Sequence, residues 1–393
     1  MRRNIVIYLF MTAIMGACGH SAKPDIKPAE EPELLWKYEG LGRGYGGPCI
    51  SKEGIFINAE ENGNSYTVCL DHNGNFRWRS SNGKEFLGIE YSASYPGTRS
   101  APTVFGRRLY AASGMGHLSC FDTRKGNVIW AVDLLNDLNG KLGDFGYSES
   151  PVVDKDKVYC FVGGQVHNLV ALDRQTGELV WSAPVKKDSF AYSTPILINL
   201  LDKKVLVGTS RNYIHVVDRK DGELLSSYQL EDIRYGYEHC NSVVYKDENI
   251  YFTACEERGQ GSIKLHLSEG GDSLTEVWRN PEVLNMFGGL VMIDNRLYTT
   301  LENKKLVGLD TRTGKIIFSV RAESGSIVYA DHKLFIYGHN GKVQLFSLKD
   351  GEPELRSEMR IRDGSGHHFS FPVIVDGVMY IRHGDALMAY TFK

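Results

Sequence analysis

Short apolar runs separated by polar turns fill most of this chain, and residues 148–182 show the pattern most clearly. Four strand-like runs occur there, at 151–153, 158–162, 169–172 and 178–181. The second run, Val-Tyr-Cys-Phe-Val, is rich in β-branched and aromatic residues, which favour strands. Because Asp and Gly residues stand in the gaps, this pattern predicts four short strands in an antiparallel meander.

A nine-residue frame repeats along the chain, with Asp, three residues, Gly, three residues and usually Trp. The copies are Asp122-Gly126-Trp130 and Asp173-Gly177-Trp181 in full, Asp71-Gly74-Trp78 with one residue fewer, and Asp218-Gly222-Ser226 and Asp310-Gly314-Phe318 with the Trp replaced. Trp78, Trp130 and Trp181 of this frame are 52 (130 − 78) and 51 (181 − 130) residues apart. A repeat of roughly 40–50 residues with strand-like content predicts a β-propeller with one four-stranded blade per repeat.

The residue types of this frame have structural explanations. An Asp carboxylate accepts backbone hydrogen bonds in a turn, and Gly tolerates positive φ. A Trp offers a large apolar plate that packs between neighbouring blades. We therefore expect blade docking from the five tryptophans, Trp36, Trp78, Trp130, Trp181 and Trp278.

The two ends of the repeat region complement each other. Residues 371–390 contain three strand-like runs, and the chain ends one strand short of a full blade. The missing strand is available at residues 33–37, where Trp36 stands at the place of the repeated Trp. Closing the ring with this N-terminal strand removes the exposed edges of an open sheet. The sequence therefore predicts an all-β, eight-bladed β-propeller of four-stranded antiparallel blades, with seven blades as the alternative if residues 325–357 do not form one.

The first 32 residues have a different character. A basic start and a short apolar run predict a signal peptide over residues 1–17. The next residue, Cys18, resembles the lipidated cysteine of a bacterial lipobox, and an ordinary signal peptide with a chance cysteine is the alternative. Polar, Pro-rich residues 18–32 then predict a lipidated cysteine and a flexible tether ahead of the propeller at 33–393. We expect an exported protein that is lipid-anchored to a bacterial membrane and faces the periplasm, and Gly19 favours the outer membrane.

Net charge and cysteine content bear on whether the chain binds nucleic acid, forms disulfides or holds a metal. The formal net charge is −3, so no nucleic-acid footprint is indicated. Of the seven cysteines, six remain after Cys18, an even number that permits disulfides in an exported protein. Cys240 and Cys255 flank a turn symmetrically, so a disulfide between them is the pairing to test. No CxxC motif occurs, and we expect no metal site.

A further group of residues recurs just before the first strand of each blade. In a propeller these positions converge on one mouth of the central channel, where they would form a funnel for a polar ligand or a partner's loop. The predicted funnel residues are Arg43, Tyr45, Arg99, Tyr147, Glu149, Tyr192, Tyr237, Glu238, His239 and His368. The alternative is that repeated Ser/Thr-x-Pro pieces form entry turns and the tyrosines pack at the rim. The two longest insertions, residues 83–100 and 133–148, would shape a binding surface on one face.

The repeat also resembles a known family. Residues 171–181, Ala-Leu-Asp-Arg-Gln-Thr-Gly-Glu-Leu-Val-Trp, look like the tryptophan-docking repeat of the pyrroloquinoline-quinone (PQQ) propeller superfamily, and residues 308–314 are similar. The resemblance covers about residues 33–393. It implies either a quinoprotein dehydrogenase that binds PQQ with calcium, or a lipidated, non-catalytic, eight-bladed propeller of the BamB type, which belongs to the β-barrel assembly machinery.

Two features favour the second branch. The alcohol dehydrogenases of this superfamily resemble one another in a vicinal cysteine pair, and no Cys-Cys occurs here. Calcium needs several oxygen ligands, and nothing fixes candidates such as Glu149 and Asn241 as a set. We therefore expect a monomeric, non-enzymatic envelope scaffold with no catalytic residues and no cofactor, which binds another envelope protein such as a β-barrel assembly component. The alternative is a PQQ-dependent dehydrogenase, or a small-molecule sensor that uses the funnel.

Overall fold

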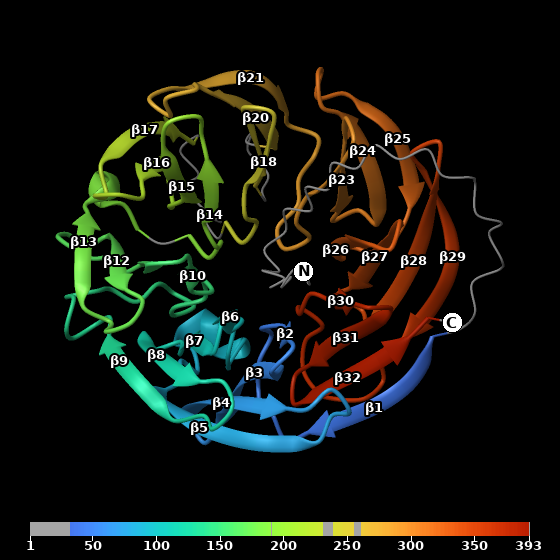
Figure 1. The fold of residues 1–393 in the computed structure, drawn as a ribbon. Helices are drawn as coiled ribbons and strands as arrows, with labels where there is room; N and C mark the ends of the chain where they lie inside the picture. The colour runs from blue at the N-terminus through green and yellow to red at the C-terminus, as the bar shows by residue number, and fades with distance from the viewer. Residues whose placement is uncertain (1–31, 190, 231–238, 255–260, 393) are drawn as a thin grey trace, which may run out of the picture.

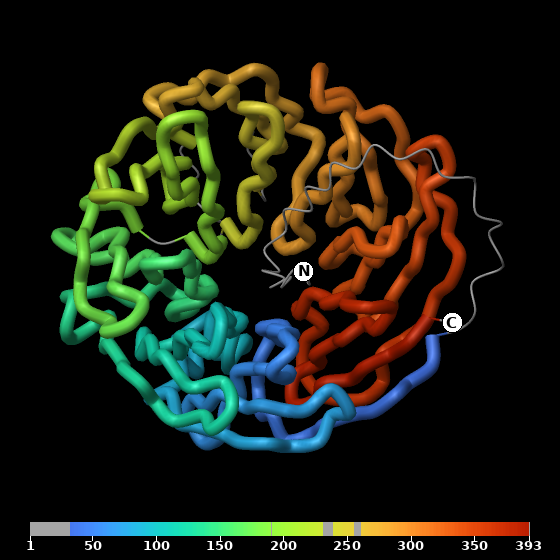
Figure 2. Tube along the Cα trace, in the orientation of Figure 1, coloured from blue at the N-terminus to red at the C-terminus, as the bar shows by residue number. Residues whose placement is uncertain are grey.

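The computed structural model of this chain is a closed ring of eight four-stranded sheets set around a central axis (Figure 1). It describes residues 32–189, 191–230, 239–254 and 261–392. The Cα trace in Figure 2 shows the red segment that ends the described chain lying beside the blue segment that begins it, where the ring closes. The prediction of eight antiparallel blades is confirmed, and the seven-blade alternative is wrong, because residues 325–360 form a complete four-stranded blade.

The strands of the first four blades follow one another in sequence, from the axis to the rim. Blade 1 contains β2 (Cys49–Ser51), β3 (Gly54–Glu61), β4 (Asn64–Leu70) and β5 (Phe76–Lys84). Blade 2 contains β6 (Thr103–Phe105), β7 (Arg108–Ala112), β8 (His117–Asp122) and β9 (Val128–Asp133). Blade 3 contains β10 (Val152–Val153), β11 (Lys157–Phe161), β12 (Leu169–Asp173) and β13 (Leu179–Ala183). Blade 4 contains β14 (Ile196–Asn199), β15 (Lys204–Thr209), β16 (Tyr213–Asp218) and β17 (Leu224–Gln229).

The remaining blades repeat this order, except that the last one takes its outer strand from the start of the chain. Blade 5 contains β18 (Val244–Lys246), β19 (Asn249–Thr253), β20 (Ser262–Leu267) and β21 (Leu274–Asn280). Blade 6 contains β22 (Val291–Ile293), β23 (Arg296–Leu301), β24 (Lys305–Asp310) and β25 (Ile316–Arg321). Blade 7 contains β26 (Gly325–Ala330), β27 (Lys333–Gly338), β28 (Lys342–Lys349) and β29 (Glu352–Arg360). Blade 8 contains β30 (Val373–Val375), β31 (Val378–His383), β32 (Ala386–Thr391) and β1 (Glu33–Glu39).

Helical structure in the described residues is limited to two short 3-10 turns. They are η1 (Glu90–Ser94) and η2 (Val185–Lys187), and both lie in connections between blades. Neither turn has the length or the apolar content that crossing a membrane requires.

A β-bulge lies between the third and fourth strands of every blade. In blade 3, Ala171 pairs with Trp181 and Leu172 pairs with Leu179, so Val180 is the extra residue. Because a bulge re-aims the side chains beside it, both Leu179 and Val180 are exposed on the outside, whereas Trp181 is only 7% exposed. The same shift occurs in the other seven blades, and in blades 2 and 5 it likewise places exposed aliphatic residues next to a buried Trp.

Each repeated tryptophan packs on a glycine turn of the next blade. The indole Nε1 of Trp78 donates to the carbonyl of Thr123 at 3.1 Å, and the ring lies 2.5 Å from the point where a Cβ on Gly126 would stand. The other pairs of this kind are Trp130 on Gly177, Trp181 on Gly222, Trp278 on Gly314 and Trp36 on Gly74. A side chain on the glycine would therefore push the indole away, so the Gly and the Trp of successive frames depend on each other.

Blade 4 makes this contact without a tryptophan. Ser226 stands at the Trp position, and its Oγ donates to the carbonyl of Gly271 at 2.8 Å. The aliphatic side chains of Leu225 and Leu200 lie 3.2 and 3.1 Å from the Cβ position of Gly271. Two leucines thus supply the apolar contact that one indole supplies elsewhere.

The ring closes through β1, which pairs antiparallel with β32 from Glu33 opposite Thr391 to Glu39 opposite Ala386. This closure by the N-terminal strand was predicted and is confirmed. Beside the closing seam, Arg382 of β31 is fully buried. Its guanidinium donates to the carbonyls of Gly384 (2.8 Å) and Asn58 (2.6 Å). Arg382 therefore ties the last blade to the first by hydrogen bonds to the backbone.

Candidate binding site at the channel mouth

Antiparallel topology sorts the loops onto two faces of the disc. Within each blade, strands 1 and 3 run in the same direction, so the connections from strand 2 to strand 3 and from strand 4 to the next blade lie on one face. We call this the mouth face. Its two longest connections in the described residues join β5 to β6 (residues 85–102) and β9 to β10 (residues 134–151). The Asp-Gly turns of the repeated frame lie on the opposite face.

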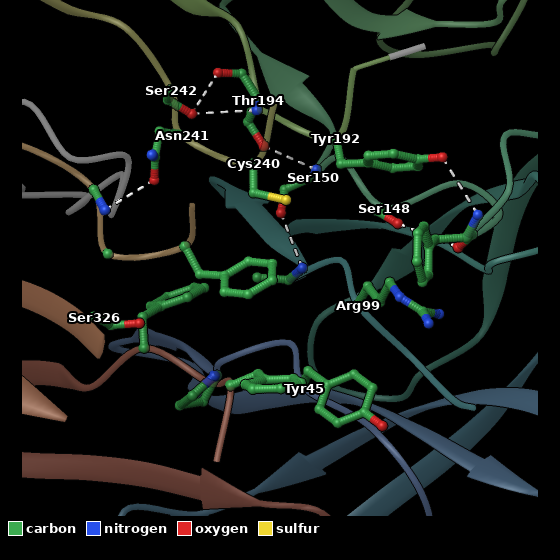
Figure 3. A pocket seen from close by; sticks show the side chains of 18 of the residues that line it. Tyr45, Arg99, Ser148, Ser150, Tyr192, Thr194, Cys240, Asn241, Ser242 and Ser326 are labelled. Carbon is green, nitrogen blue, oxygen red and sulfur yellow. Dashed lines mark hydrogen bonds between the residues drawn. The ribbon is translucent and has the colours of Figure 1, made fainter. Parts of the chain in front are cut away.

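A cavity of about 610 Å³ lies on the axis at the mouth face. Figure 3 shows its labelled side chains arranged around an open centre. Most of the lining is apolar. Its aromatic side chains come from six blade connections and include Tyr45, Tyr95, Phe145, Tyr192, Phe287 and Phe369. The volume falls in the range typical of small-molecule sites, about 300–1,000 Å³.

The aromatic side chains contact one another across the blade boundaries. The rings of Phe145 and Tyr192 meet edge to face with centroids 5.6 Å apart. Tyr95 lies 6.3 Å from Phe145 and 6.1 Å from Phe369, and Phe287 stacks on Phe369 at 5.4 Å. Such offset and edge-on arrangements are the favoured geometries of aromatic pairs. The rings therefore form a connected apolar wall instead of separate surface residues.

Arg99 brings a positive charge into this wall. Its guanidinium lies over the rings of Tyr45 (5.7 Å) and Phe145 (5.3 Å), and it donates to the carbonyls of Gly97 and Tyr95. Burial lowers the pKa of this guanidinium. Among the ion pairs of the described residues, none includes Arg99. The cavity wall thus carries a cation whose hydrogen bonds go to neutral carbonyls.

The carboxylate that acts most directly on Arg99 is Glu85, and it is engaged elsewhere. Glu85 is buried and accepts hydrogen bonds from the backbone N–H groups of Phe86 (3.0 Å) and Gly114 (2.8 Å). Burial raises the pKa of Glu85, which reduces its negative charge. Glu85 therefore balances the charge of Arg99 only in part.

The hydroxyl groups of the lining link one blade to the next. The N–H of Ala101 donates to Ser150 Oγ at 2.9 Å, and the N–H of Ser150 donates to Thr194 Oγ1 at 3.1 Å. The N–H of Thr194 donates in turn to Ser242 Oγ at 3.2 Å (Figure 3). The Ser and Thr residues before the first strands of blades 3, 4 and 5 therefore link blades 2 to 5 to one another beside the axis.

Three of the predicted funnel residues, Tyr45, Arg99 and Tyr192, lie in the cavity wall. Cys240 lies there too, whereas Cys255 is outside the described residues, so their disulfide stays a prediction. Tyr237 and Glu238 are also outside the described residues, as is Cys18.

Five other predicted funnel residues are not part of the cavity wall, because local partners hold their side chains. Two of them lie just before blade 3. The hydroxyl of Tyr147 is buried and donates to the carbonyl of Val162 at 3.0 Å. The Glu149 carboxylate is buried between blades 3 and 4, where it accepts a hydrogen bond from the N–H of Phe161. Burial raises the pKa of Glu149 to about 8.

The other three are held in different ways. Arg43 pairs with the buried Glu60 carboxylate at 3.0 Å. His239 is buried, and its Nε2 lies 3.0 Å from the carbonyl oxygen of Arg211. The ring of His368 stacks on His383 with centroids 3.7 Å apart, and its Nδ1 lies 2.7 Å from the hydroxyl of Tyr337. These contacts explain why residues at equivalent sequence positions do not share one site.

Sequence reasoning missed most of the aromatic wall. Tyr95 and Phe145 lie in the two longest insertions, and Phe287 and Phe369 lie in shorter connections. The available signal was the presence of aromatic residues in segments otherwise rich in Gly and polar residues. No spacing rule connects these positions, because they come from loops of different length.

Comparison with known proteins identifies the family. The family model described as "Outer membrane protein assembly factor BamB" matches residues 63–320, well over half of the chain. The chain belongs to the BamB family. The BamB proteins of Shewanella oneidensis and Yersinia pestis are 21% and 23% identical to it, over 65% and 72% of this chain and 65% and 71% of their own. The BamB of Kangiella koreensis is 29% identical over 39% of this chain and 34% of its own length, so the match covers less than two thirds of the Kangiella and Shewanella relatives.

Solved structures agree with BamB membership at the level of the fold. BamB from Moraxella catarrhalis superimposes with a TM-score of 0.65 at 12% identity, covering 93% of this chain and 98% of that one. The computationally designed Ika8 protein superimposes with a TM-score of 0.60 at 11% identity, covering 92% and 98%. At such low identity these structures support the propeller architecture and nothing finer.

The described lining of the cavity in this BamB-family chain does not offer the ligands that calcium beside a quinone would need. Calcium requires several oxygen ligands, usually including carboxylates. The described lining contains no Asp or Glu, because Glu149 is turned away between two blades. Asn241, the second calcium candidate, donates to the carbonyl of Asn285 at 2.7 Å and accepts from the N–H of Gly289 at 2.8 Å. Within the described residues, no group of three His, Cys, Asp or Glu side chains is placed to hold a metal ion.

Proposed function

We propose that this protein is a non-enzymatic scaffold of the bacterial envelope that supports assembly of outer-membrane proteins by binding another component of that machinery. Membership of the BamB family is the observation that carries the proposal. The relatives it matches bear the name outer membrane protein assembly factor.

The mouth face offers a surface suited to a protein partner. The short helix η1 projects from the connection between blades 1 and 2, and its neighbour Ile89 and its own Tyr91 are 63% and 70% exposed. Large exposed apolar side chains side by side are a common feature of protein-binding surfaces. The Tyr91 ring packs on Tyr95 and Phe145 and itself lines the cavity, so this exposed residue is continuous with the cavity wall.

The placement of the first described strand is compatible with an anchor that leaves this face free. Strand β1 is the fourth strand of its blade and begins at Glu33, on the face opposite the mouth. A lipid attached at Cys18 would therefore connect to the disc on the side away from Tyr91. Lipidation, export and an outer-membrane position are part of the proposal.

Deletion of the gene in the bacterium that encodes it tests the role. The expected result is a lower amount of folded β-barrel proteins in the outer membrane, measured by heat-modifiable migration on gels, with rescue by the full chain. Unchanged barrel levels in the deletion strain would rule out the assembly role. A Cys18→Ser chain that fails to fractionate with membranes, while the full chain does, would establish the anchor.

Photo-crosslinking tests the proposed surface. A photoreactive amino acid at Tyr91 on the mouth face should capture an envelope protein in living cells. Leu201 is the matched control, because it is 84% exposed but lies in the turn between β14 and β15 on the opposite face. Equal capture from Tyr91 and Leu201, or capture from Leu201 alone, would contradict this choice of surface.

A further inference from the structure

We propose that the cavity at the mouth face is a binding site for an aromatic carboxylate, a ligand with one aromatic ring and one carboxylate group. The site goes beyond the proposed scaffold role and does not depend on it. The ligand could be a free small acid or the C-terminal aromatic residue of a polypeptide, since both carry the same two groups.

The preference for an aromatic ring follows from the wall. Tyr45, Tyr95, Phe145, Tyr192 and Phe369 come from separate connections, yet their rings meet at centroid distances of 5.6–6.3 Å. A ligand ring placed among them would gain further edge-to-face or offset contacts, in addition to the burial of its own apolar surface. The cavity of about 610 Å³ holds one such ring together with its substituent.

The preference for one negative charge follows from Arg99. Its guanidinium is part of the wall, makes hydrogen bonds to two backbone carbonyls and belongs to no ion pair of the described residues. Arg43 offers a contrast, because it also lies on the mouth face but is paired with the Glu60 carboxylate at 3.0 Å. A charge-assisted hydrogen bond to a ligand carboxylate would give Arg99 the partner that Arg43 already has.

The same wall disfavours two other ligand classes. A cation would be repelled by Arg99, although aromatic rings alone would attract it. A sugar needs many donors and acceptors, whereas the hydroxyls of Ser150, Thr194 and Ser242 already accept backbone hydrogen bonds from the neighbouring blade. An aromatic acid needs one ionic contact and an apolar surface, and both are present.

Binding of three matched small molecules to the purified full-length protein tests the proposal. Calorimetry would compare 3-phenylpropionate, its uncharged amide and 3-cyclohexylpropionate. The acid should bind at least tenfold more tightly than the amide and at least threefold more tightly than the cyclohexyl analogue. Equal affinities for the acid and the amide, or no binding of the acid at about 10 mM, would overturn the proposal.

Substitution of Arg99 tests whether its guanidinium binds the carboxylate of the ligand. Arg99→Met should weaken binding of the acid at least tenfold and leave the amide unaffected. Arg79→Met is the matched control, since Arg79 also lies over a tyrosine ring (Tyr66, 3.5 Å) but far from the cavity. Loss of acid binding in the control but not in Arg99→Met would refute the site. If Arg99→Met does not fold, the comparison of acid and amide on the unaltered protein still decides.

Tripeptides separate the two sources of the ligand. Gly-Gly-Phe with a free C-terminus binding more tightly than 3-phenylpropionate, and the C-terminally amidated peptide failing to bind, would identify a polypeptide terminus. Binding of 3-phenylpropionate without binding of either peptide would identify a free small acid. Tighter binding of the amidated peptide than of the free one would count against the role of the carboxylate.

Discussion

The indole ring of Trp36 covers Gly74 across the seam between the last and the first blade. The ring lies 2.6 Å from the point where a Cβ on Gly74 would stand, and its Nε1 donates to the carbonyl of His72 at 3.0 Å. The same geometry joins Trp78, Trp130, Trp181 and Trp278 to their next blades. The strand that closes the ring therefore makes the contact that the repeats make within it.

Replacing Gly74 with alanine should destabilise the protein by more than the cost of placing a non-glycine residue at positive φ. Gly74 has a φ of +80°, which costs an L-residue roughly 1–2 kcal/mol. Displacement of the Trp36 ring by the new methyl group should add about 1–3 kcal/mol. Chemical denaturation of Gly74→Ala measures the sum.

Gly377→Ala is the matched control for this substitution. Gly377 has a φ of +75°, and no described atom lies within 4 Å of its Cβ position. The free energy of unfolding of this variant should therefore fall only by the cost of the positive φ. Equal losses in Gly74→Ala and Gly377→Ala would show that the indole contact is not tight in solution.

The indole plate itself is tested at blade 3. Trp181→Phe removes the hydrogen bond from Nε1 to the carbonyl of Arg219 (3.2 Å) but keeps an aromatic ring, and should cost about 1–2 kcal/mol. Trp181→Ser copies the residue that blade 4 carries at Ser226 without its supporting leucines, and should cost about 3–5 kcal/mol. If both variants lose the same stability in urea, the plate contributes through its hydrogen bond alone.

Substitution of Arg382 should cause one of the largest losses of stability in the protein. Arg382→Met leaves the buried carbonyl of Asn58 and the hydroxyl of Thr98 without this donor, and should cost about 3 kcal/mol or more in unfolding free energy. Arg382→Lys keeps the charge but cannot reach several acceptors at once, so it should fall between Arg382→Met and the unaltered protein. A stability of Arg382→Met equal to that of the unaltered protein would show that water replaces these bonds.

Ionisation of Glu149 should lower the free energy of unfolding as the pH rises. Its folded pKa of about 8 exceeds its ordinary value of 4.5, so the folded state holds a proton that the unfolded state has lost between those values. The stability it contributes is complete below about pH 4.5 and is lost by about pH 8, at about 1.4 kcal/mol per pH unit.

Glu149→Gln removes this titration while keeping an acceptor for the N–H of Phe161. The stability of Glu149→Gln relative to the unaltered protein should therefore rise between pH 5 and pH 8, as measured by denaturation at each pH. Glu269→Gln, at an exposed turn position, is the control for the loss of one carboxylate. A relative stability that does not change with pH would place the Glu149 carboxylate in contact with solvent.

The fold could be predicted because the repeat combines a local rule with a long period. The Asp-Gly-Trp frame specifies a turn and a docking plate, and the spacing specifies how often a blade begins. The copies with Ser226 and Phe318 in place of Trp could still be recognised, because their Asp and Gly residues are retained. The closing strand was recognised in the opposite way, by Trp36 itself, since no Asp-Gly pair precedes it.

The cavity could be predicted only in part, because a repeat fixes where a loop begins and not where its side chains point. Arg99 and Tyr192 were found by their position before a first strand, whereas Glu149 occupies an equivalent position and turns between two blades to reach Phe161. Phe145 and Tyr95 reach the axis from long insertions whose paths depend on contacts between loops. Such contacts appear only once the ring has brought the loops together.

The closing strand also sets the time at which the ring can form. Glu33 and Thr391 pair although they are 358 residues apart (391 − 33), which is nearly the whole length of the described chain. Pairing over such a separation carries a large loop-closure entropy and slows folding. During synthesis, β1 must therefore wait without its partner until β32, at the other end of the described chain, arrives beside it.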